Sequence, residues 1–248
     1  MTASPKTEMI VGLHPVRKAL ESGNRACEKL VIASGGPKNR LHSILDLARK
    51  KGIPVETLSP TVFQKRYKDK NNQSLVGYFA VRRSQNLEEL LEAASQYENP
   101  IVVILDEIQD PQNLGAVLRS AEVLGLQGAI IPNRRAAPLN ATAAKCASGA
   151  LEILPVAIVT NLVRAAEELK ENGYWVVGLD PEGATDCGSF EFTYPLALVL
   201  GGEQKGIRPL LKKTCDATVK IPMQGQVESL NASAAAAIVF YEACGKRG

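Results

Sequence analysis

The sequence has few of the features that mark membrane-bound, secreted or metal-binding proteins. No apolar run approaches the roughly 20 residues that a membrane-spanning helix needs, and the first residues, MTASPKTEM, lack the apolar core of a signal peptide. The five cysteines are far apart and form no C-x-x-C pair, so the sequence predicts neither a zinc site nor a disulfide framework. We therefore expect a cytoplasmic protein with reduced cysteines and no bound metal.

Histidine is equally scarce. The only two, His14 and His42, lie in the first fifth of the chain, where surface or packing roles are the simplest interpretation, so acid–base catalysis by histidine is not supported. What is present is ordinary for a globular protein, with 45% hydrophobic and 22% charged residues in 248. This length suits one large domain or two smaller ones and excludes a disordered or fibrous chain.

The formal charge of +3 hides a division along the chain. Residues 1–83 hold 16 Lys or Arg against 6 Asp or Glu, a net charge of +10, whereas residues 84–248 hold 13 against 20, a net charge of −7. Such an asymmetry indicates that the N-terminal part binds a polyanion, nucleic acid first of all. A solvated, lysine-rich surface is the alternative.

Residues 1–83 are expected to form a small α/β domain. Helices are predicted from Pro15 to Gly23 and over 41–51, and strands over 29–33, 54–58 and 75–81. The loop before the last strand is basic and contains a tyrosine, a mixture that suits phosphate neutralisation and base stacking on RNA, and equally a flexible surface. Its candidate RNA-binding residues are Lys65, Arg66, Tyr67, Lys68 and Lys70.

Residues 84–98 are polar and helix-prone, and we expect them to link the first domain to a second one over 99–248. In the second domain, predicted strands alternate with predicted helices, and a long Ala-rich helix over 229–244 closes the chain. Such alternation predicts a mostly parallel sheet with helices on both faces. The strands are expected at 101–105, 129–132, 156–159, 175–179, 196–200 and 218–221.

The stretch from Ile101 to Gly125 is central to this domain. Its first five residues are apolar and mostly β-branched, which is typical of a strand buried on both faces, and Asp110-Pro111 then turns the chain. We expect Asn113 to cap the helix that follows. Because α/β sheets place their ligands at the carboxyl ends of their strands, Asn113 and Arg119 are expected at the mouth of a site.

Two further polar clusters, LGGEQKG at 200–206 and IPMQGQVESLNAS at 221–233, also follow predicted strands. Gly201 and Gly202 permit close approach of the backbone to a ligand, although a lone Gly-Gly-Glu is more often a turn. Ser229 and Asn231 stand where a helix begins, so capping is their alternative role. Neither G-x-G-x-x-G nor a Gly-Lys-Ser/Thr loop is present, which disfavours a dinucleotide fold and a nucleotide hydrolase.

Taken in order, D-P-x-N-L-G-x-x-x-R, L-G-x-E-x-x-G and I-P-M-x-G-x-x-x-S-L-N-x-S resemble the three motifs of the SpoU (TrmH-like) RNA ribose 2′-O-methyltransferases. Residues 140–162 further resemble the RlmB branch, which methylates a guanosine ribose in 23S ribosomal RNA. The resemblance covers about 150 residues strongly, and the N-terminal part more loosely as the ribosomal-protein-like RNA-binding domain of that branch. One departure is Asn72-Gln73-Ser74, where the branch usually has His-Gln-Gly.

This resemblance implies an enzyme that uses S-adenosylmethionine (AdoMet) and whose C-terminal segment threads through a loop to form a trefoil knot, a feature too rare to expect from periodicity. The knot would form the cofactor pocket. The family also implies a homodimer formed through the methyltransferase domain, with the active site close to the interface. The cofactor-binding role falls on Gly201, Gly202, Ile221, Met223 and Leu230, with core packing as the alternative for the last three.

The catalytic set that the resemblance implies consists of Arg119, Asn113, Glu203, Ser229 and Asn231. The family gives the motif-one arginine the role of base, yet arginine has a pKa above about 12. Two mechanisms stay open. In one, a second cation and desolvation lower the proton affinity of Arg119; in the other, Arg119 holds an RNA phosphate bidentately while the proton leaves through a phosphate oxygen or water.

The expected function is therefore AdoMet-dependent methylation of a ribose 2′-hydroxyl in RNA, at a guanosine of 23S ribosomal RNA. Transfer RNA or another ribosomal site is the nearest alternative. A non-catalytic RNA-binding protein of the same fold is the more distant one, although such a protein would not need all five residues of the catalytic set.

Overall fold

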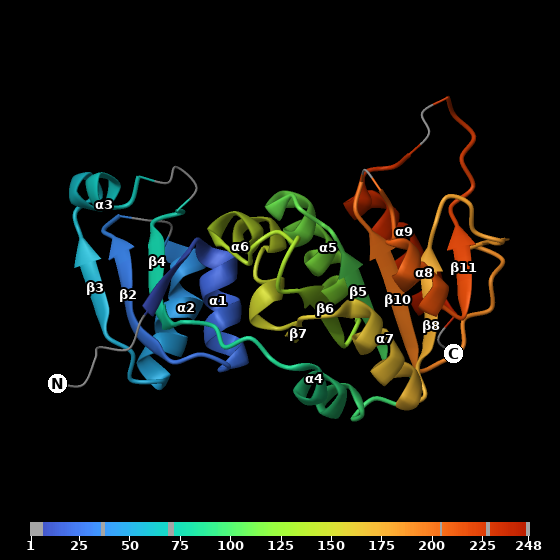
Figure 1. The fold of residues 1–248 in the computed structure, drawn as a ribbon. Helices are drawn as coiled ribbons and strands as arrows, with labels where there is room; N and C mark the ends of the chain where they lie inside the picture. Colours follow the sequence, from blue (N-terminus) through green and yellow to red (C-terminus); the bar gives the residue numbers. More distant parts are fainter. Residues whose placement is uncertain (1–6, 36–37, 69–71, 204, 227–228, 247–248) are drawn as a thin grey trace. The chain divides into compact units, whose positions relative to one another are not determined.

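The computed structural model describes residues 7–35, 38–68, 72–203, 205–226 and 229–246 (Figure 1). The predicted RNA-binding residue Lys70 lies outside them. The chain divides into two compact units, the first made of Met1–Arg83 with Ser148–Ile153 and the second of Ser84–Ala147 with Leu154–Gly248. Within the described residues, no helix is long and apolar enough to cross a membrane.

The described residues of the first unit form a four-stranded sheet, three α-helices and a short 3-10 helix over Ala150–Glu152. Strand β4 lies between β1 and β2 and is antiparallel to both, and β3 pairs in parallel with β2 at the edge. Strand β1 was not expected from the sequence, because TEMIV is short and does not alternate. The elements are β1 (Thr7–Val11), α1 (Leu13–Ser22), β2 (Cys27–Ala33), α2 (Lys38–Lys50), β3 (Val55–Leu58), α3 (Pro60–Arg66) and β4 (Leu75–Ala80).

Apolar side chains bury both faces of this small sheet. Helices α1 and α2 cover one face, where Leu20, Ile44 and Phe79 belong to a single core cluster. On the other face, Phe63 of α3 packs in a second cluster with Val31 and other residues of the sheet. The sequence therefore predicts the α/β character of this unit correctly.

The short segment Ser148–Ile153 joins the first unit although it lies far along the chain. Its Glu152 carboxylate accepts a hydrogen bond from Arg25 Nη1 at 3.0 Å, and each of the two side chains is only 6% exposed. The Glu152 carbonyl accepts a further bond from Asn24 Nδ2 at 3.1 Å. The sequence places this segment in the second domain, because a pairing over more than 120 residues leaves no local signal.

The second unit contains a seven-stranded sheet in which every pairing is parallel. The strand order is β7-β6-β5-β10-β8-β11-β9, so the chain changes direction across the sheet between β5 and β10. The prediction of a mostly parallel sheet is confirmed. The strands are β5 (Ile101–Asp106), β6 (Gly128–Pro132), β7 (Val156–Val159), β8 (Trp175–Leu179), β9 (Thr185–Asp186), β10 (Leu196–Gly201) and β11 (Ala217–Lys220).

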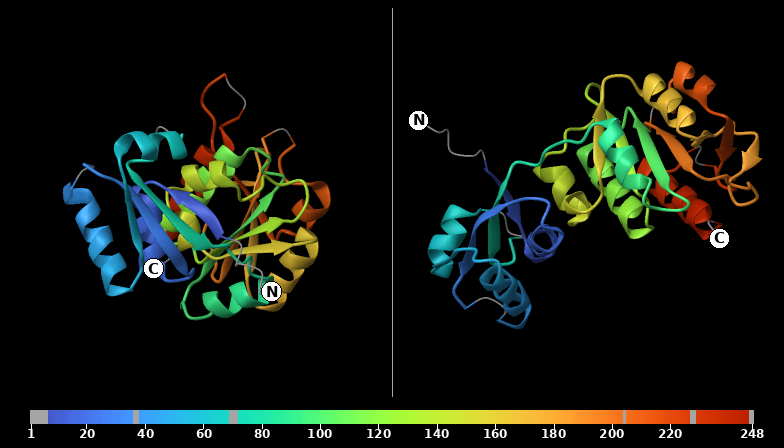
Figure 2. Two further views of the ribbon diagram at one scale, coloured as in Figure 1. Left: turned by 90° about the vertical axis from the view of Figure 1, so that its left-hand side faces the viewer. Right: turned by 90° about the horizontal axis from the view of Figure 1, so that it is seen from below.

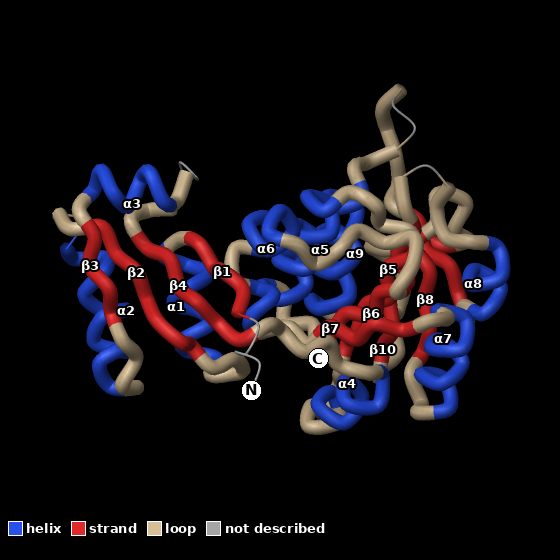
Figure 3. The backbone as a smooth tube through the Cα atoms, turned by 60° about the vertical axis from the view of Figure 1, so that its left-hand side comes forward, coloured by secondary structure: helices blue, strands red, loops and turns tan. Residues whose placement is uncertain are grey.

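Helices cover both faces of this sheet, as Figures 1 and 3 show and as the two views of Figure 2 allow the reader to follow. Helices α4, α7 and α8 pack into one apolar core with the central strands, and α5 lies between α6 and α9. The helices are α4 (Leu87–Ala94), α5 (Pro111–Val123), α6 (Ala141–Ala147), α7 (Leu162–Glu171), α8 (Pro209–Thr214) and α9 (Ala232–Gly245).

Three local features differ from the sequence-based expectations. The segment over 84–98 contains α4, whose Leu87, Leu90 and Ala94 are buried in the core of the second unit. The sequence predicts a helix over 140–151, but α6 ends at Ala147 because Ser148 and Gly149 adopt positive φ angles of 53° and 98°. Asp110 caps α5 by accepting a hydrogen bond from Gln112 N at 2.9 Å, since Pro111 takes the first helical position.

Candidate active site

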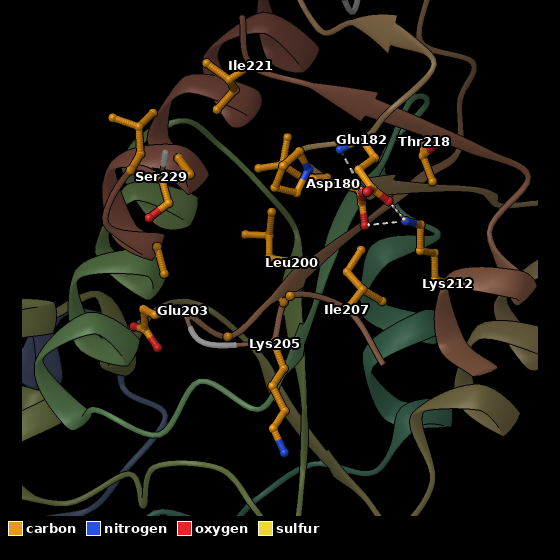
Figure 4. A pocket seen from close by; sticks show the side chains of 18 of the residues that line it. Asp180, Glu182, Leu200, Glu203, Lys205, Ile207, Lys212, Thr218, Ile221 and Ser229 are labelled. Carbon is orange, nitrogen blue, oxygen red and sulfur yellow. Dashed lines mark hydrogen bonds and ion pairs between the residues drawn. The ribbon is translucent and has the colours of Figure 1, made fainter. Parts of the chain in front are cut away.

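A cavity of about 1160 Å³ opens at the carboxyl ends of β8, β10 and β11, beside the point where the chain changes direction across the sheet (Figure 4). Parallel α/β sheets place ligands at this position. All five predicted cofactor-binding residues line the cavity: Gly201, Gly202, Ile221, Met223 and Leu230. Met223 and Leu230 are 43% and 38% exposed, so they are not merely residues of a closed core.

Gly201 and Gly202 are needed because the backbone of the same chain lies against them. A Cβ atom on Gly201 would come within 2.0 Å of the Gly206 carbonyl carbon, and one on Gly202 within 2.4 Å of the Glu107 carbonyl oxygen. Real Cβ atoms do not approach other atoms so closely. Gly201 thus allows the loop after β10 to turn back on itself, and Gly202 allows it to pack against the segment after β5. This role differs from the direct ligand approach that the sequence suggests.

Three predicted catalytic residues are joined by hydrogen bonds. Asn231 Nδ2 donates to Asn113 Oδ1 at 3.0 Å, and Asn113 Nδ2 donates to the carboxylate of Glu203. The links bring together the first turn of α5, the loop after β10 and the start of α9. The Asn113 side chain is therefore engaged with Glu203 and Asn231, and Asp110 caps the helix in its place.

The Asn231 end of this series of hydrogen-bonded side chains is anchored to the backbone of α9. Asn231 caps α9, because its Oδ1 accepts a hydrogen bond from Ser233 N at 2.9 Å. Its side chain consequently has a fixed orientation, with the oxygen toward α9 and the amide toward Asn113. The capping role that the sequence offers for Asn231 is confirmed, and the same side chain also contacts Asn113 of the predicted catalytic set.

Glu203 and Ser229 line the cavity together, on one side of the close-up view in Figure 4. Glu203 is exposed and carries the only described carboxylate that accepts from Asn113. Carboxylate, amide and hydroxyl groups can all bind a sugar hydroxyl. The cavity edge can therefore orient a ribose, while the apolar Leu200 and Ile207 lie between this edge and the opposite side.

The opposite side of the cavity holds an ion pair that the sequence reasoning missed. Lys212 Nζ lies 2.8 Å from Asp180 Oδ2 and 3.7 Å from Glu182 Oε2 (Figure 4). The hydrogen bond to Asp180 raises the pKa of Lys212. The sequence carries no signal for this pair, because its two residues are far apart in the chain and belong to none of the three motifs.

Arg119 does not line this cavity within the single chain. It lies on α5, six residues after Asn113, so helical geometry turns it away from the Asn113 side. Its side chain is exposed and makes no hydrogen bond or ion pair with a described residue. Within the described residues, no group of three or more His, Cys, Asp or Glu side chains could hold a metal ion.

The predicted RNA-binding residues of the first unit are only partly available. Tyr67 is buried at 5% exposure, where its ring packs at 4.8 Å from that of Phe63 and its hydroxyl lies 3.1 Å from that of Tyr78. It therefore serves the core and cannot stack on a base in this conformation. Lys65, Arg66 and Lys68 are exposed, and Arg66 pairs with Glu56 at 3.2 Å.

Comparison with known proteins agrees with this geometry. Residues 100–241 match the SpoU rRNA Methylase family, and residues 9–85 match the domain described as RNA 2′-O ribose methyltransferase substrate binding. The chain belongs to the SpoU rRNA methylase family. It is accordingly an AdoMet-dependent RNA 2′-O-methyltransferase of the SpoU/TrmH type, with the substrate-binding domain at its N-terminal side.

Similar proteins match nearly the whole SpoU chain. YacO of Bacillus subtilis (strain 168), assigned to the TrmH family of tRNA/rRNA methyltransferases, is 40% identical over 245 residues, which cover 98% of each chain. The 23S rRNA (guanosine-2′-O-)-methyltransferase RlmB of Vibrio parahaemolyticus is 36% identical over 97% of each chain. The crystal structure of the SpoU methyltransferase AviRb from Streptomyces viridochromogenes, in complex with AdoMet, aligns with a TM-score of 0.78 and 26% identity, covering 97% of this chain and 90% of that one.

Proposed function

We propose that this SpoU enzyme transfers the methyl group of AdoMet to the ribose 2′-hydroxyl of a guanosine in 23S ribosomal RNA, in the cytoplasm. The observation that carries this proposal is the hydrogen-bonded chain Asn231–Asn113–Glu203 at the edge of a cavity walled by Gly201 and Gly202. The similarity to the Vibrio RlmB over 97% of the chain supports the choice of substrate.

The residues around the cavity suit AdoMet. Ile221, Leu230 and Met223 offer apolar walls for the adenosyl group, and the glycine loop offers backbone polar groups. When bound, AdoMet supplies an electrophilic methyl group on a sulfonium. The residues of this chain must then place a ribose hydroxyl in line with it and help to remove its proton, and such alignment alone can supply much of the rate enhancement.

Asn113 is the residue that we assign to this alignment. Because its oxygen accepts from Asn231, its amide must face Glu203, and the carboxylate of Glu203 is then held at the cavity edge beside Ser229. A carboxylate held in this way accepts a hydrogen bond from the attacking hydroxyl. Glu203 and Ser229 orient the ribose, and Asn113 with Asn231 orients Glu203.

Arg119 would act on the site of a second copy of the chain. Helix α9 is apolar on nearly every side, and its Ile238 and Tyr241 are 38% and 67% exposed, while Val123 of the neighbouring α5 is 69% exposed. A surface of this kind is typical of a dimer interface. We propose a homodimer through this α5/α9 face, in which the partner's Arg119 completes the cavity and is desolvated or paired with an RNA phosphate.

A trefoil knot around the cavity belongs to the same proposal. Two segments far apart in sequence, the loop Gly201–Ile207 and the stretch from Ile221 to Leu230, line one cavity, and α9 then packs against α5. The threading that the family resemblance implies would hold these segments together. It would also give AdoMet a rigid backbone cradle.

The experiment that tests the target is a map of ribose methylation across total RNA from cells with and without the protein. The proposal predicts the loss of a single methylated guanosine in 23S ribosomal RNA. Loss of a methylated ribose in transfer RNA would support transfer RNA as the substrate instead. The description of YacO as a tRNA/rRNA methyltransferase covers this alternative. No change in any RNA would favour a non-catalytic RNA-binding protein.

A further inference from the structure

The loop that connects β6 to α6 carries two neighbouring exposed arginines, Arg134 and Arg135. Arg134 makes no ion pair with a described residue, and both arginines are exposed. The side chain of Arg135 is 71% exposed, and its Nη1 lies 3.7 Å from Glu107 Oε1, a distance near the limit of an ion pair. Although the Glu107 side chain is only 16% exposed, the long separation and the exposure of Arg135 keep the contribution of this pair to stability small.

This loop is held firmly despite its exposed arginines. Asn133 N donates to Val159 O at 2.9 Å on one side, and Ala137 N donates to Ile108 O at 2.7 Å on the other. Between these anchors, Arg135 adopts a left-handed φ of 59°, which is unfavourable for a residue with a side chain. The two guanidinium groups are therefore presented from a fixed base.

The same loop lies close to the proposed active site. Strands β5 and β6 are paired neighbours, so their carboxyl-end loops lie side by side. Glu107, which Arg135 meets, has its carbonyl oxygen against Gly202 in the wall of the cavity. Arg135 is thus linked to the cavity wall through one residue.

The charge of the second domain makes this position significant. Residues 84–248 carry a net charge of −7, which repels a polyanion. Any RNA that enters the cavity must nevertheless bring its phosphates to this edge of the sheet. Arginine is the side chain best suited to bind phosphate, because its planar fork donates two parallel hydrogen bonds.

We propose that Arg134 and Arg135 form a second RNA-binding surface, which holds the phosphodiester backbone next to the target nucleotide. This surface is separate from the substrate-binding domain over residues 9–85, and its proposed role rests on the function proposed above. Arg134 and Arg135 position the RNA and take no part in the chemistry. Glu107 competes weakly for Arg135 until a phosphate replaces it.

The test uses the full-length protein and an unmodified 23S ribosomal RNA transcript. We expect the double variant R134A/R135A to bind this RNA about tenfold more weakly, with a slope of log affinity against log salt that is less steep by about one to two. AdoMet affinity and kcat at saturating RNA should stay within about twofold of the wild type. The control is Lys170→Ala, which removes a cation near the end of α7 that pairs with Asp216 at 2.6 Å and should leave both RNA affinity and salt slope unchanged.

A second variant separates binding from stability. Arg135→Gly removes the charge and also relieves the left-handed φ, so it should fold at least as well as the wild type and still bind RNA more weakly. Wild-type RNA affinity and salt slope in both variants would overturn the inference, as would a loss of AdoMet affinity. If the wild type itself transferred no methyl group to any RNA, the proposed function would fail instead.

Discussion

The carboxylate of Asp106, the last residue of β5, accepts two hydrogen bonds from Arg208, one from the backbone N at 2.9 Å and one from Nε at 2.8 Å. Asp106 is completely buried, and it lies opposite Gly201 in the register of β5 with β10. Arg208 immediately precedes α8. This pair therefore fixes both ends of the loop Gly201–Arg208, which forms one wall of the proposed cofactor cavity.

Asp106→Ala should lower the free energy of unfolding by about 2–3 kcal/mol, because two hydrogen bonds to a buried charge are lost. It should also weaken AdoMet binding, since the loop loses its anchor. Chemical denaturation and calorimetric titration with AdoMet measure the two effects. Asp186→Ala is the control, because Asp186 is half-exposed and its pair with Lys220 spans 3.9 Å, so a change within about 0.5 kcal/mol is expected. Equal stabilities of the two variants would contradict the anchoring role.

Asn113→Asp should reduce methyl transfer strongly with little loss of fold. The substitution keeps the size of the side chain but replaces the amide that donates to Glu203 with a second carboxylate, and like charges repel. We expect kcat to fall by about tenfold or more, equivalent to at least about 1.4 kcal/mol in the barrier. Gln112→Ala, an exposed neighbour on α5, serves as the control. Normal turnover in Asn113→Asp would show that the hydrogen-bonded chain is not part of the active site.

Ser74→Gly should stabilise the first unit. Ser74 has a left-handed φ of 62°, and it stands at the last position of Asn72-Gln73-Ser74, where the RlmB branch usually has glycine. Relief of this strain should raise the free energy of unfolding by about 0.5–1 kcal/mol. Ser43→Gly, within α2, should lower it by a similar amount because glycine disfavours helix. Thermal denaturation of both variants measures these changes in stability. A loss of stability in Ser74→Gly would contradict the account.

The thiols of Cys27 and Cys215 should be unreactive at neutral pH. Burial raises the pKa of each to about 11, so at pH 8 the thiolate is scarce in the folded state. Alkylation by iodoacetamide should therefore be about two orders of magnitude slower than for a free cysteine. The linked effect on stability has a defined sign. The folded state keeps the proton more firmly, so stability is full below the pKa of the unfolded thiols and falls as pH rises toward 11. Rapid labelling of the folded protein would contradict this.

Arg119→Lys should abolish most of the activity in either mechanism, because lysine lacks the planar guanidinium fork. We expect a loss of at least about tenfold in methyl transfer. Separate measurement of RNA affinity distinguishes the two mechanisms. If Arg119 is the base, the variant loses turnover but binds RNA normally; if Arg119 binds a phosphate, RNA affinity falls as well. Arg164→Lys, on the exposed side of α7, is the control. Near-normal turnover in Arg119→Ala would exclude both mechanisms.

Local patterns in the sequence predict much of the fold. The apolar run Ile101–Leu105 forms β5 with every residue buried, and the helix after Pro111 ends before Gly125, whose φ is 77°. Strand β1, TEMIV, shows neither alternation nor a continuous apolar run, and the two-residue β9 is too short to show either. The early end of α6 depends on the positive φ angles of Ser148 and Gly149, which an Ala-rich sequence does not reveal.

The candidate site could be predicted only through its motifs. Asn113 and Glu203 are 90 residues apart, and no local property of either indicates that they share a hydrogen bond. Tyr67 shows the opposite problem, because an aromatic residue in a basic loop suggests RNA stacking and yet fills the core. The Lys212–Asp180 pair lies outside every motif and required the structure.

The most direct test of the central claim is transfer of a labelled methyl group from AdoMet to unmodified 23S ribosomal RNA, followed by alkaline hydrolysis. A methylated 2′-oxygen cannot attack the neighbouring phosphodiester, so the account predicts that the label appears in one alkali-stable dinucleotide that begins with guanosine, and that Asn113→Asp greatly reduces it. Label on a base, or no transfer by the wild type to any RNA, would contradict the account.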